Sequence, residues 1–154
     1  MFNLKGIVEK YQSLTSAEIS LHSLRVNPTI WIDEEEVDIF CSYIQEINLI
    51  TILIDEVIMI ARDNNWEPEE VFEYILVHEI GHSLDPELEE LNSQLVNNEE
   101  LSEVKFRAEV NAWKIADTII PEQTLRYKIL RANCLEAYSE GHPEWRDKWC
   151  PDYF

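Results

Sequence analysis

The segment 68–84 constrains the fold of this chain more than any other, because its apolar residues cover most of the circumference of a helix. A proline at its first position and two glutamates behind it suit the start of a helix. The same segment contains His78, Glu79 and His82. Burying these polar groups costs free energy unless they are bonded, and a metal ion would bond them.

His78 and His82 have the spacing of two ligands of one zinc ion, and Glu79 directly follows the first. Residues four apart on an α-helix share a face, with Cβ atoms about 5–6 Å apart, so both imidazoles can reach the same ion. Zinc prefers a tetrahedron of ligands, and two histidines fill half of it. Glu79 is displaced by about 100° around the helix and is predicted to be the general base that accepts a proton from the attacking water. The alternative is a pair of structural histidines.

Glu109 is the candidate for the third protein ligand. It lies within about 60° of the apolar stripe of a later helical segment. Ala112 and Ala116 follow on that segment and would let the two helices approach each other closely. The alternative for Glu109 is a boundary glutamate that reaches solvent. The competing carboxylates are Asp85, Glu99, Glu100 and Glu103.

Two supporting roles also have candidates. Asp85 has a short side chain three residues beyond His82, so it suits the orientation of a histidine ligand better than direct ligation. An oxyanion formed during hydrolysis needs a hydrogen-bond donor. The candidates for that donor are Tyr127, Tyr138 and His142, and the sequence does not choose among them.

The net charge of the chain limits the classes of partner that it is expected to bind. The formal net charge is −19 and the sequence pI is about 4.4. A phosphate backbone or an anionic membrane needs basic partners, so direct binding to nucleic acid or to a membrane is not expected. A basic partner protein fits this charge, and a plainly solvated acidic exterior is the alternative.

The cysteines and the N-terminus indicate a cytoplasmic protein. Cys41, Cys134 and Cys150 are odd in number and widely spaced, so they form neither a disulfide framework nor a cysteine zinc cluster. We expect three reduced thiols. The N-terminus lacks a basic region followed by an apolar run, and no segment is a continuous apolar membrane span.

Local patterns predict the elements of the first half. Residues 1–26 indicate two short helices, the second begun by a capping box from Thr15 to Glu18. Residues 29–32 indicate a strand, and a capping box from Asp33 to Glu36 predicts an amphipathic helix that continues to Ile47. The β-branched runs 50–54 and 57–61 predict two strands, as a hairpin or as one long bent strand.

The second half is expected to be helical. Asp85 and Pro86 end the motif helix, and residues 87–100 are predicted to form loop and short helix. A helix from Leu101 stops at Pro121, and the last helix lies within 122–140 and is ended by Gly141. The aromatic tail after it is expected to fold back on the domain.

His78-Glu79-Ile80-Gly81-His82, followed by Glu109-Val110-Asn111-Ala112 and by Ala116 to Pro121, resembles the ImmA/IrrE-like zinc metallopeptidases, which are small gluzincin-type zincins. The resemblance covers roughly residues 50–121. It implies His78 and His82 as the first two zinc ligands, Glu79 as the base and Glu109 as the third ligand. It also implies a DNA-binding repressor as the substrate. The longer zincin motif with a third histidine is excluded, because it would require Gly at 85 and His at 88, where the chain has Asp and Leu.

We therefore expect an α+β protein with a zincin-like minimal metallopeptidase fold. It would have a small, twisted, mostly antiparallel sheet with the active-site helix and other helices packed on one side. A chain of 154 residues predicts one domain, with a helical cover over 1–27, the zincin core over 28–121 and a C-terminal helix and aromatic tail over 122–154.

Two functions fit these expectations. The first is a zinc-dependent endopeptidase that cleaves a protein partner, such as a basic transcriptional regulator. The second is a non-catalytic acidic protein that contains zinc and acts as an anti-repressor or a DNA mimic. Glu79 favours the first, because a purely structural zinc site needs four protein ligands and no base.

Overall fold

The computed structural model describes residues 3–24, 29–32, 34–38, 40–97 and 102–154. It is a mixed α+β structure whose contacts divide the chain into two compact units, residues 1–83 and 84–154. The expectation of one domain stays a prediction. None of the described helices combines the length and the apolar composition needed to cross a membrane. The cytoplasmic location likewise stays a prediction.

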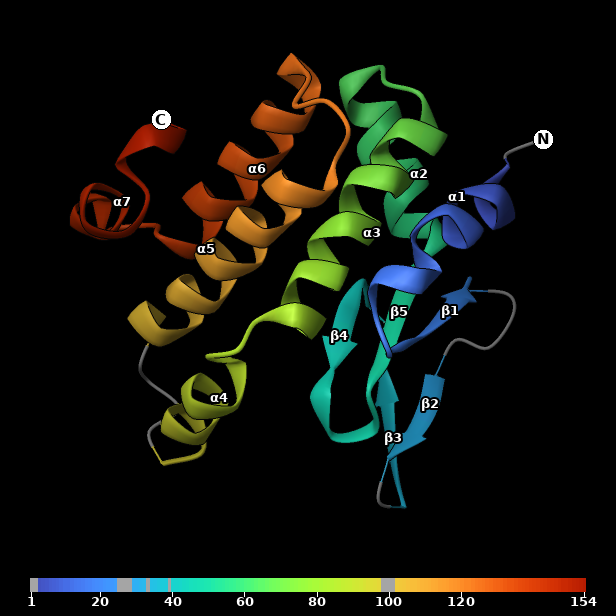
Figure 1. The fold of residues 1–154 in the computed structure, drawn as a ribbon, viewed down its shortest axis with the longest axis horizontal. Helices are drawn as coiled ribbons and strands as arrows, with labels where there is room; N and C mark the ends of the chain where they lie inside the picture. The colour runs from blue at the N-terminus through green and yellow to red at the C-terminus, as the bar shows by residue number, and fades with distance from the viewer. Residues whose placement is uncertain (1–2, 25–28, 33, 39, 98–101) are drawn as a thin grey trace. The chain divides into compact units, whose positions relative to one another are not determined.

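The first unit is built around a three-stranded sheet in the order β1-β5-β4 (Figure 1). β1 (Glu18–His22) runs parallel to β5 (Leu49–Leu53), and β4 (Ser42–Ile44) runs antiparallel to β5. β2 (Thr29–Ile32) and β3 (Glu35–Asp38) form a separate antiparallel pair. The sheet is therefore mixed, and its longer pairing is the parallel one, where a mostly antiparallel sheet was expected.

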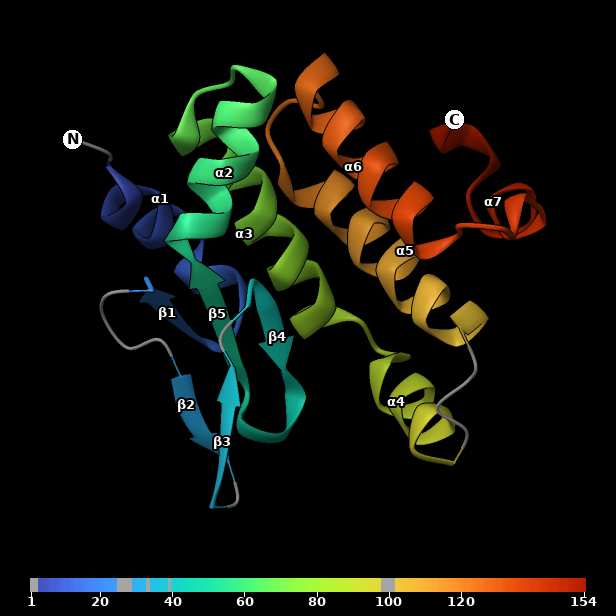
Figure 2. The ribbon, with the colours of Figure 1, turned by 180° about the vertical axis from the view of Figure 1, so that it is seen from behind.

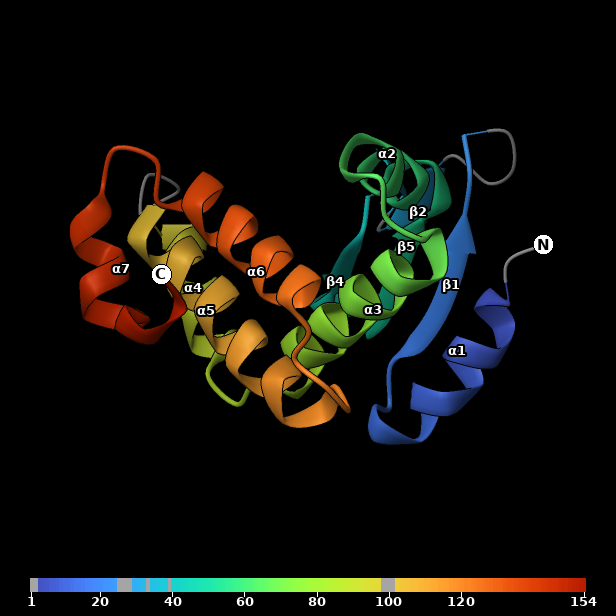
Figure 3. The same ribbon diagram turned by 90° about the horizontal axis from the view of Figure 1, so that it is seen from above.

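Three helices accompany this sheet. They are α1 (Leu4–Tyr11), α2 (Ile54–Asn64) and α3 (Pro68–Leu84). Figures 1 to 3 show α1 and α3 on the same side of the sheet. The central strand β5 is covered, since Ile50, Thr51 and Ile52 are buried, and the apolar core continues through Val57, Ala61, Val71, Phe72, Leu76 and Ile80.

The prediction of a second N-terminal helix was wrong. The chain forms a 3-10 turn over Gln12–Leu14 and then enters strand β1. Thr15 does not close a capping box, because its Oγ1 accepts from the amide of Ala17. The amide of Glu18 donates to the carbonyl of Asn48 and begins the parallel pairing with β5. The long-range pairing of β1 with β5 therefore overrides the local sequence preference for a helix.

The predicted amphipathic helix up to Ile47 was also wrong. Asp33 lies outside the described residues, and Glu36 is part of strand β3. The rest of the segment forms β4 and a 3-10 turn over Gln45–Ile47. Phe40 is 61% exposed and Ile47 is 45% exposed, so the expected apolar stripe is not buried as a helix face. The predicted strand over 29–32 is confirmed as β2.

The β-branched runs after residue 50 separate into one strand and one helix. The first run is confirmed as strand β5, but the second is helix α2. Asp55 and Glu56 lie in the first turn of α2, where negative charge stabilises a helix, and are not a hairpin turn. Val57 and Ala61 are buried four residues apart, which is the period of a helix face.

The second unit is helical throughout its described part. It contains α4 (Leu88–Asn97), α5 (Ser102–Ile119), α6 (Leu125–Tyr138) and α7 (Pro143–Trp149). The predicted helices before Pro121 and before Gly141 are confirmed, and Gly141 has a positive φ of 79°. In the core, Trp113 of α5 packs edge-on against Tyr127 of α6, with ring centroids 5.6 Å apart.

The aromatic tail folds back on α5, as predicted. Trp149 Nε1 donates to Glu103 Oε1 at 2.9 Å in the first turn of this helix. Tyr153 donates its hydroxyl to Asp117 Oδ2 at 2.5 Å near the other end. The C-terminal segment therefore contacts α5 at two points that lie almost four turns apart.

Asp117 is the centre of a buried polar network in this unit. Arg131 Nη1 donates to both carboxylate oxygens, at 2.7 and 2.9 Å, and the hydroxyl of Tyr127 donates to Oδ1 at 2.9 Å. The Arg131 guanidinium also stacks 3.7 Å from the ring centroid of Tyr153. The network thus joins α5, α6 and the C-terminal turn.

We predict that Asp117→Asn destabilises the second unit strongly. The Asp117 and Arg131 side chains are only 15% and 5% exposed, so the substitution leaves a buried guanidinium without its counter-charge. The expected loss is about 3–5 kcal/mol, measured by urea denaturation with far-ultraviolet circular dichroism.

The matched control is Asp63→Asn. Asp63 pairs with Arg62 through side chains that are 59% and 73% exposed, so this substitution should cost at most about 1 kcal/mol. Equal losses for the two variants would show that the Asp117 network does not stabilise the fold.

Candidate metal centre

Helix α3 places the zinc motif inside the protein. It begins at Pro68 with Glu69 and Glu70 in its first turn, as the sequence predicts, and ends at Leu84, directly before Asp85 and Pro86. Apolar residues on every side of this helix are buried, which confirms that it has almost no solvent face: Val71, Phe72, Tyr74, Ile75, Leu76, Val77 and Ile80.

Polar contacts with the N-terminal segment hold α3 within the first unit. Glu73, on its middle turn, accepts hydrogen bonds from the hydroxyl of Tyr11 and from Lys10 Nζ, the latter at 2.9 Å. Near its end, Ser83 Oγ donates to the carbonyl of Ile80 at 2.7 Å and lies 2.7 Å from Thr15 Oγ1. The motif therefore lies on a helix that is bonded along its length to the N-terminal segment.

The structure gathers the three motif side chains. The imidazole rings of His78 and His82 lie edge to face, with centroids 4.7 Å apart and planes at 73°. One ligand atom from each of His78, Glu79 and His82 lies within 4.8 Å of the other two. His78 and Glu79 are 6% and 5% exposed, and His82 is half-buried.

This donor set suits zinc. Imidazole nitrogen and carboxylate oxygen are both zinc ligands, and the two rings occupy the same face of one helix turn. His78, Glu79 and His82 all lie on one helix, so a further protein ligand would have to come from another part of the chain. The arrangement can therefore hold one cation and place a carboxylate next to it.

Cys41 was not recognised as a neighbour of the motif. Its thiol donates to the carbonyl of Leu53 at 3.8 Å. Burial raises the pKa of the Cys41 thiol, and the negative charges of Glu56 and Glu79 raise it further. Cys41 is therefore a neutral thiol close to the predicted base. This proximity could not be predicted from the sequence, because the predicted helix around Cys41 does not form.

Glu109 lies in the second unit, on α5. It is half-buried, and Cys134 of α6 donates its thiol hydrogen to Glu109 Oε2 with a sulfur–oxygen distance of 3.8 Å. The small residues Ala112 and Ala116 are both fully buried. The role of Glu109 as third zinc ligand stays a prediction.

The other carboxylates have different positions. Asp85 caps the turn after α3, with Oδ1 accepting from the amide of Glu87 at 2.9 Å and Oδ2 accepting from Asn111 Nδ2 at 3.2 Å. Its role in orienting a histidine stays a prediction. Glu103 binds Lys148 and Trp149, as described for the tail. Glu99 and Glu100 lie outside the described residues.

The three candidates for the oxyanion donor differ in exposure. Tyr127 is fully buried and donates its hydroxyl to Asp117, and its burial raises its pKa. Tyr138 is 45% exposed at the end of α6. His142 stacks on Trp145 with ring centroids 4.0 Å apart, and its Nδ1 lies 3.0 Å from Glu144 Oε1. The hydroxyl of Tyr127 is therefore bonded within the core of the second unit, whereas the side chains of Tyr138 and His142 are accessible to solvent.

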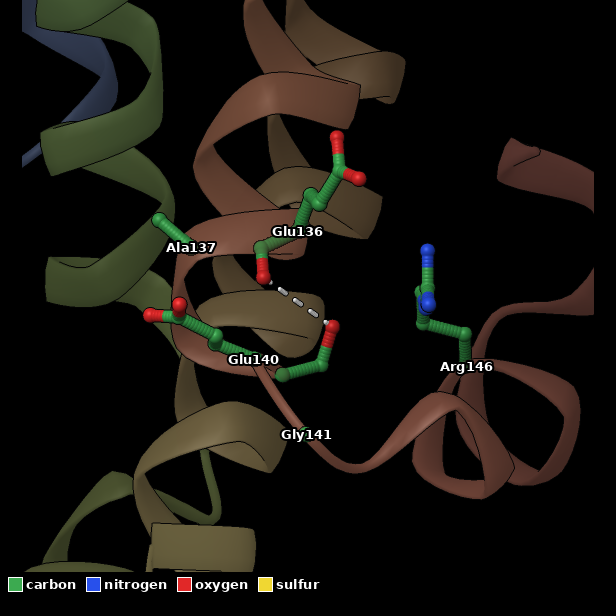
Figure 4. Close-up of a pocket in the computed structure, with 6 residues that line it drawn as sticks. Glu136, Ala137, Glu140, Gly141 and Arg146 are labelled. Carbon is green, nitrogen blue, oxygen red and sulfur yellow. Dashed lines mark hydrogen bonds between the residues drawn. The ribbon is translucent and has the colours of Figure 1, made fainter.

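A cavity of about 270 Å³ lies between the end of α6 and α7. Figure 4 shows Glu136 and Arg146 on opposite sides of it. Its lining residues are Glu136, Ala137, Ser139, Glu140, Gly141 and Arg146. This lining contains none of the predicted zinc ligands and not the predicted base, so the cavity is not the site of the motif.

Comparisons of the chain with protein-family models, curated proteins and solved structures yielded no match. The ImmA/IrrE-like resemblance therefore rests on the motif residues alone.

We predict a loss of stability at high pH through Tyr11, which bonds α3. Burial, followed by the hydrogen bond to Glu73, raises the pKa of Tyr11 from 10.0 to about 12. Because the folded protein favours the neutral phenol, this stabilisation is fully present below pH 10 and is lost as the pH rises through about 12.

The difference in unfolding free energy between wild type and Tyr11→Phe isolates this contribution from the other titrating groups. Urea denaturation should show the difference falling between pH 10 and pH 12 in favour of the variant. A difference that stays constant over this range would contradict the assignment.

Proposed function

We propose that this protein is a zinc-dependent endopeptidase that cleaves a protein substrate. The observation that carries the proposal is the gathering of one ligand atom each from His78, Glu79 and His82 within 4.8 Å on a buried helix. A cation can bond imidazole and carboxylate groups that gather in the interior, and this supports the proposal.

In this proposal His78 and His82 hold the zinc ion and Glu109 completes the protein ligands. Bound zinc acts as a Lewis acid on the scissile carbonyl and on the attacking water. Glu79 accepts the proton of that water through its carboxylate and can return a proton to the leaving amine. A zincin-like arrangement of the fold belongs to the same proposal.

The substrate we propose is a basic DNA-binding regulator of the repressor type. Two considerations support it: the resemblance of the motifs to ImmA/IrrE-like peptidases, and the net charge of −19, which favours association with a basic protein. The same charge also favours the second candidate, a non-catalytic acidic protein that occupies a basic DNA-binding surface and contains structural zinc.

We predict that Glu79→Gln abolishes peptide cleavage and keeps the bound zinc and the fold. The amide preserves the shape of the side chain but cannot accept the proton, so the rate should fall by at least about 10²-fold. Wild type and variant are incubated with a lysate of the source cells, and newly formed protein termini are identified by mass spectrometry. Elemental analysis measures the zinc content of both proteins.

Terminus profiles that are identical while both proteins contain zinc would contradict the peptidase proposal and favour the acidic interaction protein. Absence of zinc from wild-type protein purified without added metal, with no uptake on titration, would contradict both candidates.

We predict that Glu109→Ala removes most of the zinc affinity. A ligand is lost in this variant, so the dissociation constant measured by competition with a chelating dye should rise strongly. Glu103→Ala is the matched control on the same helix, because Glu103 binds Lys148 and Trp149 of the tail. Its zinc affinity should stay close to wild type. The reverse order would contradict the assignment of Glu109.

A further inference from the structure

Cys134 lies against the carboxylate that is predicted to bind zinc. Its thiol donates to Glu109 Oε2 over 3.8 Å, and both side chains are half-buried. Figures 1 to 3 show these two helices side by side within the second unit. From the sequence, Cys134 is expected only to be a reduced thiol.

The packing of the second unit fixes α6 at this position. One turn before Cys134, Arg131 binds both oxygens of Asp117 on α5, at 2.7 and 2.9 Å. Leu135, the next residue, is fully buried. α6 therefore cannot slide or rotate along α5 without breaking a buried ion pair. The thiol is presented to Glu109 by a rigid element and not by a loop.

We propose that Cys134 is a positioning residue that holds the Glu109 carboxylate in the orientation for zinc binding. This inference rests on the proposed function, in which Glu109 is the third ligand. Carboxylates that bind a metal are themselves held by hydrogen bonds, and loss of such a bond typically lowers metal affinity 10–100-fold. The S–H group is a weak donor, so Cys134 belongs at the lower end of this range.

The hydrogen bond also explains why a thiol suits this position. A cationic donor would compete with zinc for the negative charge of Glu109, whereas a neutral donor orients one oxygen and leaves the charge of the carboxylate in place.

The experiment measures zinc affinity by chelator competition for wild type, Cys134→Ala, Cys134→Ser and Cys150→Ala. Cys134→Ala should weaken zinc binding about tenfold, while Cys134→Ser, which keeps a donor of similar size, should stay within about threefold of wild type. Cys150→Ala is the control, because Cys150 is a buried thiol that directly follows α7. Its zinc affinity should not change.

A double substitution separates positioning from a general loss of structure. In the Glu109→Ala background, Cys134→Ala should leave the residual zinc affinity unchanged, because the carboxylate that it orients is absent. A further loss of affinity in that background would overturn the proposal. So would equal affinities of wild type and Cys134→Ala, or equal losses for the alanine and serine variants.

Cobalt(II) in place of zinc distinguishes orientation from direct ligation. The positioning role predicts a cobalt protein without a thiolate-to-cobalt charge-transfer band. A band that disappears in Cys134→Ser would overturn it, because Cys134 would then be a ligand itself. Failure of the wild-type protein to bind zinc or cobalt at all would instead overturn the proposed function, and this inference with it.

Discussion

The burial of ionisable groups on α3 is the constraint on which the rest of the structure depends. His78 is 6% exposed and Glu79 is 5% exposed, so the imidazole and the carboxylate have lost most of their contact with water. Such a transfer is unfavourable unless hydrogen bonds or a metal replace the lost hydration. A helix that only needed to fill a core would carry apolar residues at these positions. Burying this polar turn therefore costs stability, which the surrounding apolar residues of α3 must offset.

The helix itself could be predicted from sequence because all its signals are local and agree. Proline at the first position, acidic residues behind it and an Asp-Pro stop define its bounds, and α5 and α6 were found from the same kind of pattern. The first unit was predicted less well. β1 pairs with β5 across 31 positions of the chain, from Glu18 to Leu49, and such a long-range pairing leaves no local signature. The β-branched composition of residues 57–61 suggested a strand. These residues instead form part of helix α2, in which Val57 and Ala61, four residues apart, are both buried.

The same distinction between local and long-range contacts applies to the candidate site. His78, Glu79 and His82 could be grouped from sequence alone, since the geometry of one helix turn fixes their separation. The neighbours of the motif could not. Cys41 approaches Glu79 through the sheet, and Cys134 meets Glu109 through the packing of α6 on α5. Such contacts join distant positions of the chain, and a single sequence contains no record of them.

The acidic residues of α5 are chemically similar, but they have different partners in the folded structure. Glu103 in the first turn accepts from Lys148 and Trp149, and Asp117 near the last turn accepts from Arg131 and two tyrosines. Both carboxylates are therefore engaged in attaching the C-terminal segment and α6 to this helix. A carboxylate already neutralised by a lysine or an arginine is a poor zinc ligand, because the cations compete for the same oxygens. Glu109, between them, meets a neutral thiol. The thiol of Cys134 does not compete with a cation for Glu109 Oε2, and this supports the proposal that Glu109 is the ligand.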